Sequence, residues 1–193
     1  MARHDGPDIH PASETAMSLE PPRFAARKGE VLLPFDPARS MGGPRLMYIG
    51  RLRTPWKERA DCPRNLPDAR RLMAERGQTA MLEVDKPFRP GLESLAFYGH
   101  IIVMYWMDEA DRRLIVQNPK KRPGLHGVFS LRSPARPNPI ALSTVRILNL
   151  DQEEGQIEID AIDCVDGTPL LDIRPWVESL DAPDGSCRDQ SGG

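Results

Sequence analysis

The sequence is poor in the residues that build metal centres and disulfide frameworks. It contains three cysteines and four histidines among 193 residues. Cys62, Cys164 and Cys187 lie far apart, and no CxxC pair occurs. Structural zinc sites need clustered Cys or His ligands, so neither a zinc site nor a disulfide framework is expected. Because Cys62 has no obvious base in the sequence, we expect an inert thiol rather than a nucleophile.

Several other signals are also missing. No apolar run approaches the roughly 20 residues of a membrane helix, and no apolar segment follows Met1 as it would in a signal peptide. We therefore expect a cytoplasmic protein without a membrane partner. The sequence has no GxGxxG, Walker or GxSxG motif. A Rossmann dinucleotide site, a phosphate-binding P-loop and a nucleophile elbow are thus not indicated.

Charge is distributed unevenly, although the formal net charge is only −2. Residues 112–146 contain eight Lys or Arg and no Asp or Glu, whereas residues 147–189 contain twelve Asp or Glu and two Arg. A basic segment of this kind suits an anionic partner such as RNA or a nucleotide. A solvated face balanced by the acidic segment explains the same pattern equally well. Charge alone leaves both interpretations open.

The chain divides into an extension and one strand-rich body. Residues 1–44 are rich in Pro, Gly and charge, which predicts a partly flexible extension that docks a short piece around VLLPFDP. Short apolar or alternating segments separated by Pro and Gly turns then predict an all-β barrel or a mostly β sheet in preference to an α/β fold. The expected strands are 45–54, 79–84, 97–107, 112–117, 140–150, 155–165 and 170–173.

Helical structure is expected in two places only. Residues 68–77 predict one short helix, and residues 89–95 predict a helical turn that begins after a proline. DEAD is expected to join strands 97–107 and 112–117 as a pair, and DQEEG to join strands 140–150 and 155–165 as a hairpin.

The segment HGVFSLRSPARPNPIAL, residues 126–142, places three prolines within six positions. Proline fixes φ and restrains the residue before it, so this segment predicts a stiff polar loop without a helix or a central strand. Arg132 and Arg136 offer planar forks for carboxylate, phosphate or base edges, and Asn138 carries both a donor and an acceptor that suit an adenine edge. A surface crossover with solvated arginines is the alternative.

Two quoted motifs resemble a known family. GVFSLRSPARPNPIALS followed by VDGTPLLDIRPW resembles the TsaA-like, or TrmO, family. The resemblance extends upstream through YIGRLRTPWKERADCPRN and GLESLAFYGHIIVMYW, and it covers about residues 46–178.

The resemblance implies a fold, a reaction and a cofactor. Family members are tRNA adenine N6-methyltransferases that use S-adenosyl-L-methionine to methylate threonylcarbamoyladenosine beside the anticodon. Their fold is a single-sheeted β-barrel that forms homodimers. We therefore expect a mostly β, TsaA-like barrel with short helices at residues 45–180, an irregular N-terminal extension at 1–44 and a polar tail at 181–193.

The resemblance also implies site residues. The positions that match the family's cofactor segments are Arg64, Asn65, Leu66, Asp108, Glu109, Arg132, Leu142, Asp166, Gly167, Thr168 and Pro169. The Gly-bearing turn at 166–169 would expose backbone N–H and C=O groups to the cofactor. Arg136 and Asn138, on the stiff loop, are expected to orient the target nucleotide of the RNA. No catalytic residue is assigned, because methyl transfer needs mainly alignment.

Some positions depart from the family pattern. Ala135 stands where the family has His or Phe, Ala141 where it has Gly, and Asn65 where it often has Gln. Bacterial members carry a further C-terminal domain, whereas the residues after Trp176 here are polar. Two alternatives to the tRNA reaction therefore stay open: a module that binds S-adenosyl-L-methionine for regulation, and a methyltransferase that acts on another RNA or on a small molecule.

Overall fold

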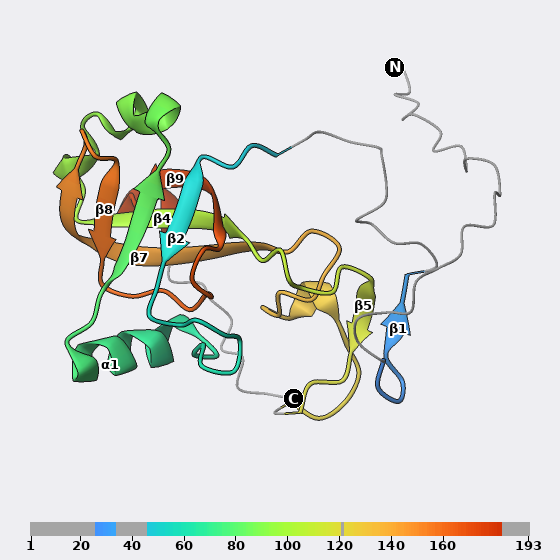
Figure 1. Cartoon of the computed structure of the whole chain (residues 1–193). Coiled ribbons are helices and arrows are strands. Elements are labelled where there is room, and N and C mark those ends of the chain that lie inside the picture. Colours follow the sequence, from blue (N-terminus) through green and yellow to red (C-terminus); the bar gives the residue numbers. More distant parts are fainter. Residues whose placement is uncertain (1–25, 34–45, 121, 183–193) are drawn as a thin grey trace, which may run out of the picture.

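Six antiparallel strands close into a barrel, with the order β2-β3-β8-β7-β4-β9 (Figure 1). The computed structural model describes residues 26–33, 46–120 and 122–182. The barrel strands are β2 (Gly50–Arg53), β3 (Ala80–Val84), β4 (His100–Trp106), β7 (Ile140–Asp151), β8 (Gln156–Ile159) and β9 (Pro169–Pro175). The predicted mostly β barrel is confirmed. Predictions on residues 1–25, 34–45 and 183–193 lie outside the described residues.

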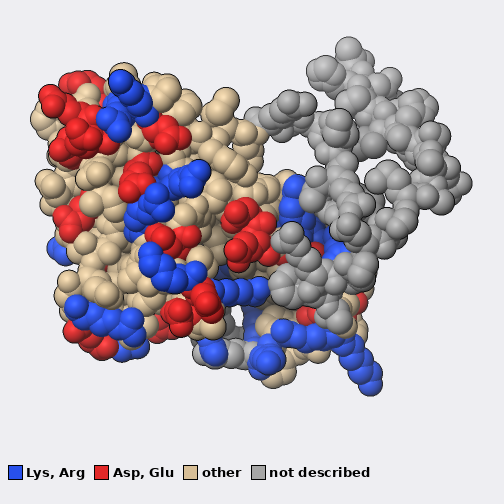
Figure 2. All heavy atoms as spheres, in the orientation of Figure 1, with Lys and Arg blue, Asp and Glu red and all other residues tan. Residues whose placement is uncertain are grey.

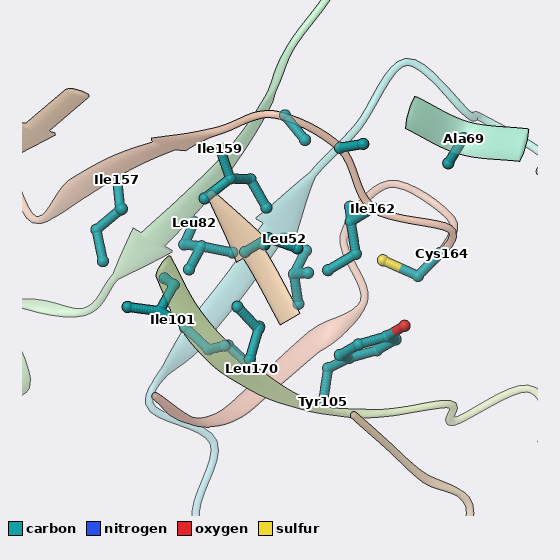
Figure 3. Close-up of a cluster of buried hydrophobic side chains, with 14 of the residues drawn as sticks. Leu52, Ala69, Leu82, Ile101, Tyr105, Ile157, Ile159, Ile162, Cys164 and Leu170 are labelled. Atoms are coloured by element: carbon teal, nitrogen blue, oxygen red, sulfur yellow. The ribbon is translucent and has the colours of Figure 1, made fainter. Parts of the chain in front are cut away.

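The barrel interior is filled by aliphatic side chains at alternate positions along each strand. Strand β4 buries Ile101, Val103 and Tyr105, while its other residues face outward or lie half-buried. Leu52 and Leu82 from the facing strands pack against the same cluster, as Figure 3 shows. Successive side chains of a strand point to opposite faces, so a period of two lets one face of each strand line a continuous core.

Strand β7 is long enough to pair with two neighbours. Its first half pairs with β4 from Ile140 to Arg146, and its second half pairs with β8 from Ile147 to Asp151. The register shifts between Ile147 and Asn149. Such an irregularity bends a strand and increases its twist, which lets one strand turn the corner of a small closed barrel. The predicted β7–β8 hairpin is confirmed.

One helix packs against the barrel. Helix α1 (Leu66–Arg76) begins after Asn65, whose side chain accepts from the Asp68 N–H, and it ends at Gly77 in the left-handed conformation. Ala69 and Met73 join the barrel core. The other helical pieces are short: η2 (Lys86–Leu92), η3 (Leu95–Phe97), η4 (Val128–Ser130) and α2 (Glu178–Asp181). The helix predicted over 68–77 is present, shifted by two residues at its start.

A second, small sheet stands beside the barrel, in the order β1-β5-β6 (Figure 1). Its strands are β1 (Val31–Leu32), β5 (Leu114–Gln117) and β6 (His126–Gly127). The predicted pairing of strands 97–107 and 112–117 is therefore wrong. Strand β4 instead pairs with β7 and β9, because both sides of a barrel strand must be paired.

Part of the N-terminal extension docks on this small sheet. Beyond the β1–β5 pairing, the Arg27 Nη1 donates to the Asn118 carbonyl at 2.9 Å. The Asn118 N–H in turn donates to Glu30 Oε1 at 2.9 Å. Residues 26–33 thus contact the small sheet, and residues 34–37 of VLLPFDP lie outside the described residues.

Two strands are shorter than the sequence predicted. Of the predicted strand 45–54, the described residues 46–54 form a strand only at Gly50–Arg53, and residues 155–165 do so only at Gln156–Ile159. Beyond Ile159 the chain leaves the sheet and packs across one end of the barrel. The Trp56 indole donates to the Ile162 carbonyl at 3.0 Å, and the Thr54 hydroxyl donates to the Cys164 carbonyl at 3.0 Å. Side chains therefore satisfy backbone groups that a strand partner would otherwise occupy.

Within the described ranges, no helix has the length and apolar character needed to cross a membrane.

Candidate functional site

The register of the sheet brings the predicted segments to one end of the barrel. Tyr105 of β4 pairs with Leu170 of β9, and Trp106 pairs with Ile140 of β7. Arg51 of β2 pairs with Pro169. Because the strands are antiparallel, the chain after β2, the chain after β4, the loop before β7 and the turn before β9 all emerge at the same end. The predicted cofactor segments, far apart in the sequence, share this end of the barrel.

The turn at Asp166–Pro169 uses its backbone N–H groups within the fold. The N–H of Asp166 donates to the Trp56 carbonyl at 2.8 Å, and that of Gly167 donates to the Leu52 carbonyl at 2.8 Å. The N–H of Thr168 donates to the Val165 carbonyl at 3.2 Å. The expectation that these N–H groups are exposed to a cofactor is therefore wrong.

The turn at Asp166–Pro169 instead has carbonyl oxygens that can accept hydrogen bonds from a ligand. The carbonyls of Asp166 and Gly167 have no hydrogen-bond donor within the described residues. Gly167 has a φ of 83°, and a Cβ placed there would meet no atom within 4 Å. The turn is thus open and rich in acceptors, which suits a ligand that donates hydrogen bonds.

The Asp166 carboxylate fastens the turn to the segment after β2. It accepts from the Thr54 N–H at 3.0 Å and pairs with the Lys57 Nζ at 2.8 Å. Partial burial would raise the pKa of Asp166, but the Lys57 hydrogen bond, the Thr54 N–H and the charges of Lys57 and Arg53 hold it below its ordinary value. Asp166 is therefore an ionised structural anchor at neutral pH.

Arg132 and Leu142, both predicted to bind the cofactor, are in contact. The Arg132 Nη2 donates to the Leu142 carbonyl at 3.4 Å, a long hydrogen bond. Both side chains are exposed, and the Arg132 guanidinium has no other hydrogen-bond partner within the described residues. Most of its donor groups therefore remain for a ligand.

Arg136 has a different environment. Its Nε donates to the Ser133 carbonyl at 2.9 Å, and its Nη2 donates to the carbonyls of Val128, at 3.0 Å, and Leu131. The guanidinium is half-buried among these groups. This arrangement favours a role in shaping the loop over direct contact with a nucleotide. The side chain of Asn138 is exposed and has no partner within the described residues.

Two further side chains brace the Pro-rich loop. The Arg112 Nε donates to the Pro137 carbonyl at 2.7 Å, and the Gln117 amide donates to the Ala135 carbonyl. Arg112 also lies over the Trp106 ring at 5.2 Å. The prolines preset the backbone, and these side chains satisfy carbonyls that have no strand partner. The loop is therefore held in one conformation by its own prolines and by hydrogen bonds from Arg112 and Gln117.

The residues at 64–66 do not share one role. Arg64 is exposed and has no partner within the described residues. Asn65 serves as the N-cap of α1, since its side chain accepts from the Asp68 N–H at 2.8 Å and donates to the Asp68 carboxylate at 3.0 Å. Leu66 is half-buried and packs on the core. Only Arg64 presents a side chain that is free for a ligand.

Asp108 and Glu109 follow β4 and are exposed. The preceding residue, Met107, donates its N–H to the Pro139 carbonyl at 2.9 Å. The structure therefore places this pair beside the Pro-rich loop. No hydrogen bond or ion pair joins them to the Asp166 turn within the described residues.

A buried polar cluster at this end was missed by sequence reasoning. The Tyr105 hydroxyl is 3.1 Å from Ser143 Oγ and donates to Asp163 Oδ1 at 3.1 Å. Burial raises the pKa of Asp163 above its ordinary value, against the opposing effects of the Tyr105 hydrogen bond and the Arg132 charge. A signal was present: Asp163 is the one charged residue in the run AIDCV, residues 161–165.

Cys62 lies near this cluster. Burial, with a contribution from the Asp163 charge, raises the pKa of the Cys62 thiol to about 11. A thiol with such a pKa is almost entirely protonated at neutral pH, so it is a poor nucleophile.

Two open cavities lie near α1. The larger, about 820 Å³, is lined among others by Arg70, His100, Arg146 and Asp160 on the outside of the barrel. The smaller, about 660 Å³, is lined by Thr54, Lys57 and Asp166 and so adjoins the candidate site. Neither includes Arg132 or Leu142. Burial and hydrogen bonding, rather than cavity size, define the site.

The small sheet forms a basic module beside the site, which we define as residues 26–33 and 112–136. Its described basic residues are Arg27, Lys28, Arg112, Arg113, Lys120, Arg122, Arg132 and Arg136, and its only acidic residue is Glu30. Figure 2 shows blue surface at the lower right, whereas both signs mix over the barrel. The module also exposes 82% of Phe129.

The fold is a closed antiparallel barrel and not a Rossmann sheet. One end of it carries groups that suit a ligand, namely the acceptor-rich turn and the exposed Arg132, beside the basic module. Residues 51–182 match the family model described as tRNA-methyltransferase O N-terminal domain. The chain belongs to this family.

Known proteins agree with this assignment. A probable S-adenosyl-L-methionine-binding protein, VirR, from Rhizobium radiobacter is 37% identical over 134 residues, 69% of this chain and 71% of that protein. A mouse tRNA (adenine(37)-N6)-methyltransferase is 34% identical over 93 residues, 48% of this chain and 21% of the mouse protein.

Solved structures of TrmO have a similar fold. One is 30% identical with a TM-score of 0.59, and the similarity covers 77% of this chain and 64% of that one. Another, from Pseudomonas aeruginosa, is 26% identical with a TM-score of 0.58, covering 79% and 64%. The chain thus spans less than two thirds of the solved TrmO chains.

Proposed function

We propose that this protein transfers a methyl group from S-adenosyl-L-methionine to a nitrogen of a tRNA base, namely N6 of threonylcarbamoyladenosine next to the anticodon. One observation carries the proposal: Arg132, the Leu142 carbonyl and the Asp166–Pro169 turn gather at one barrel end, directly beside the basic module. A cofactor site and an RNA surface therefore adjoin.

The donor and acceptor groups of the site fit the cofactor. Arg132 and Arg64 are exposed guanidinium groups that suit the carboxylate of its methionine part. The free carbonyls of Asp166 and Gly167 suit donor groups such as an adenine amino group. The names of the bacterial and archaeal relatives, which describe S-adenosyl-L-methionine-binding proteins, support the same choice.

The chain's own residues would mainly position the reactants. When bound, the cofactor supplies an electrophilic methyl group. The braced Pro-rich loop and the anchored Asp166 turn hold the surrounding groups in one geometry before substrate arrives. Such positioning can lower a barrier by about 7–11 kcal/mol. Arg136 contributes by fixing the loop.

The basic module supplies the surface for RNA. Lys28, Lys120 and Arg122 are exposed and have no partner within the described residues, so their charges remain for phosphates. Phe129, mostly exposed beside them, offers a face for base stacking. Its position on η4, just before Arg132, brings this face close to the site.

The proposal also includes a homodimer in the cytoplasm. The outer face of β7 exposes Ile140, Leu142 and Leu148 at 44%, 49% and 41%. Exposed apolar side chains on one sheet face favour burial against another chain. Light scattering coupled to size exclusion would give a mass of two chains if the dimer forms, and of one chain if it does not.

Mass spectrometry of tRNA nucleosides tests the function. The purified protein, incubated with the cofactor and tRNA that carries threonylcarbamoyladenosine, should add one methyl group to that nucleoside. Unmodified tRNA should stay unmethylated. Cofactor binding without transfer to any RNA would favour the regulatory module, and methylation of another nucleoside would favour a different RNA substrate.

A further inference from the structure

Asp163 occupies the junction of the candidate site. It lies on the chain that follows β8, three residues before Asp166. Its Oδ1 accepts from the Tyr105 hydroxyl of β4 at 3.1 Å. The same hydroxyl lies 3.1 Å from Ser143 Oγ, and Ser143 directly follows Leu142, whose carbonyl accepts from Arg132. Asp163 is therefore connected to β4 directly and, through the Tyr105 hydroxyl, to β7 beside the residue that accepts from Arg132.

Unlike its neighbours, Asp163 has no cation of its own. Asp160 pairs with Arg70 at 2.6 Å, and Asp166 pairs with Lys57 at 2.8 Å. No cation within the described residues comes within ion-pair distance of Asp163, although its carboxyl is half-buried. A half-buried carboxylate without a cation in ion-pair contact costs free energy, so a fold that keeps one is expected to use it.

The groups that face Asp163 come from four segments. They are Tyr105 on β4, Cys62 before α1, the adjacent Cys164, and Arg132 on the Pro-rich loop. Burial raises the pKa of Tyr105, Cys62 and Cys164, so these three are neutral at neutral pH. Arg132 is thus the one charged group that faces Asp163 from these segments.

We propose that Asp163 is the base that accepts the proton of the substrate nitrogen during methyl transfer. The inference rests on the proposed function. The acceptor nitrogen uses its lone pair for the new N–C bond, and the electron pair of the broken S–C bond stays with sulfur. The N–H proton passes to a carboxylate oxygen of Asp163 and from there to solvent. Tyr105 is a positioning residue, because its hydroxyl orients the carboxylate.

Burial gives Asp163 a property that suits a base. A carboxylate whose pKa lies above its ordinary value holds a transferred proton more strongly, and general bases act best when their pKa approaches the working pH. Arg132 and Tyr105 act in the opposite direction and favour the ionised form of the carboxyl group.

The test compares Asp163→Asn with Asp172→Asn, a carboxylate on β9 that bonds to the Ile173 N–H and Arg174. Affinities for S-adenosyl-L-methionine and S-adenosylhomocysteine are measured by calorimetry, and turnover on modified tRNA over a range of pH. For Asp163→Asn we expect cofactor affinities within twofold of wild type and a kcat at least about 100-fold lower. Asp172→Asn should keep wild-type turnover.

Tyr105→Phe provides a second variant that leaves the carboxylate in place. It removes a hydrogen bond that lowers the pKa of Asp163, so the acid limb of its kcat profile should move to higher pH. An unmoved acid limb would overturn the inference.

Three further results would also overturn it. The first is wild-type turnover in Asp163→Asn. The second is a loss of affinity for S-adenosyl-L-methionine but not for S-adenosylhomocysteine, which would place Asp163 against the sulfonium charge. The third is a lowered melting temperature of unliganded Asp163→Asn at neutral pH, which would assign a structural role. A wild-type protein that neither binds the cofactor nor methylates tRNA would remove the proposed function itself and this inference with it.

Discussion

The Tyr105 hydroxyl and the Asp163 carboxylate, 3.1 Å apart, join strand β4 to the segment that leaves β8. Tyr105 is 3% exposed, and its ring belongs to the barrel core shown in Figure 3. The hydroxyl end of the same side chain reaches the polar site. One residue thus connects the apolar interior, which holds the barrel together, with the groups proposed to act on the substrate.

Arg132 and Arg136 should respond differently to replacement by alanine. Arg136→Ala leaves the carbonyls of Ser133 and Leu131 without their donor, whereas the Val128 carbonyl keeps the Leu131 N–H. We therefore expect a loss of about 2 kcal/mol of stability in chemical denaturation. Arg132→Ala should change stability by less than about 0.5 kcal/mol, because this side chain is exposed. Calorimetry should instead show weaker cofactor binding for Arg132→Ala.

The opposite result for Arg136 would restore its assignment to the substrate. That result is wild-type stability and cofactor affinity in Arg136→Ala, together with lost transfer to RNA.

Asp166 should stabilise the fold in a pH-dependent way. Its pKa is lower in the folded chain than the ordinary value of 3.8. Its contribution is therefore complete above the unfolded value and disappears as pH falls through the folded value. Asp166→Asn should lower the melting temperature at pH 7, by the equivalent of about 1 kcal/mol or less for a partly exposed ion pair. The difference from wild type should shrink as pH falls below 3.8 and vanish below the folded pKa, and a difference that does not change with pH would show that charge is not the cause.

The contribution of Asp163 to stability should change with pH in the opposite direction to that of Asp166. Its folded pKa lies above the ordinary value of 3.8, so ionisation is harder in the folded chain and stability falls as pH rises through that range. Asp163→Asn removes this cost, and unliganded protein should melt at the same or a higher temperature than wild type at pH 7. The gain should shrink as pH falls through the folded pKa and disappear below the unfolded value of 3.8. A gain independent of pH would contradict the assignment.

Gly50 should tolerate no side chain. A Cβ on Gly50 would lie 2.0 Å from the Glu83 carbonyl oxygen of the neighbouring strand. Gly50→Ala should therefore cost about 3 kcal/mol in stability, because two paired barrel strands must separate. Gly99→Ala serves as the control, since a Cβ there meets no atom within 4 Å. Equal urea midpoints for the two variants would show that the strands can move apart freely.

The basic module should bind RNA through two separable contributions. Phe129→Ala should weaken tRNA binding by about 1–3 kcal/mol, with little change in its salt dependence, because stacking carries no charge. Arg122→Ala should lower the salt slope by about one. Lys86→Ala, on η2 at the opposite barrel end, is the matched control and should bind as wild type. Equal effects of all three variants on tRNA binding would contradict the proposal that the basic module binds RNA.

The sequence by itself determined the fold class and most of the segments that build the site. Alternating apolar residues in short runs predicted a barrel or a mostly β sheet, and the family resemblance specified the barrel. The β7–β8 hairpin was correct because a short polar turn joins two strands of matched pattern. The motif around Arg132 and the Asp166 turn identified the family, and the matched residues 51–182 confirm it. These features are local, so the order of residues along the chain is enough to specify them.

Tertiary structure decided which groups remain free to act. The chain after β4 continues into a separate small sheet because β7 and β9 already occupy both edges of β4. The N–H groups of the Asp166 turn are used by Trp56 and Leu52, and the Arg136 fork is used by the carbonyls of its own loop. The hydrogen bond on which the proposed role of Asp163 rests forms only because β4 brings Tyr105 against it. A residue type shows what a side chain can donate or accept, but only closure of the barrel determines which of those bonds the fold itself consumes.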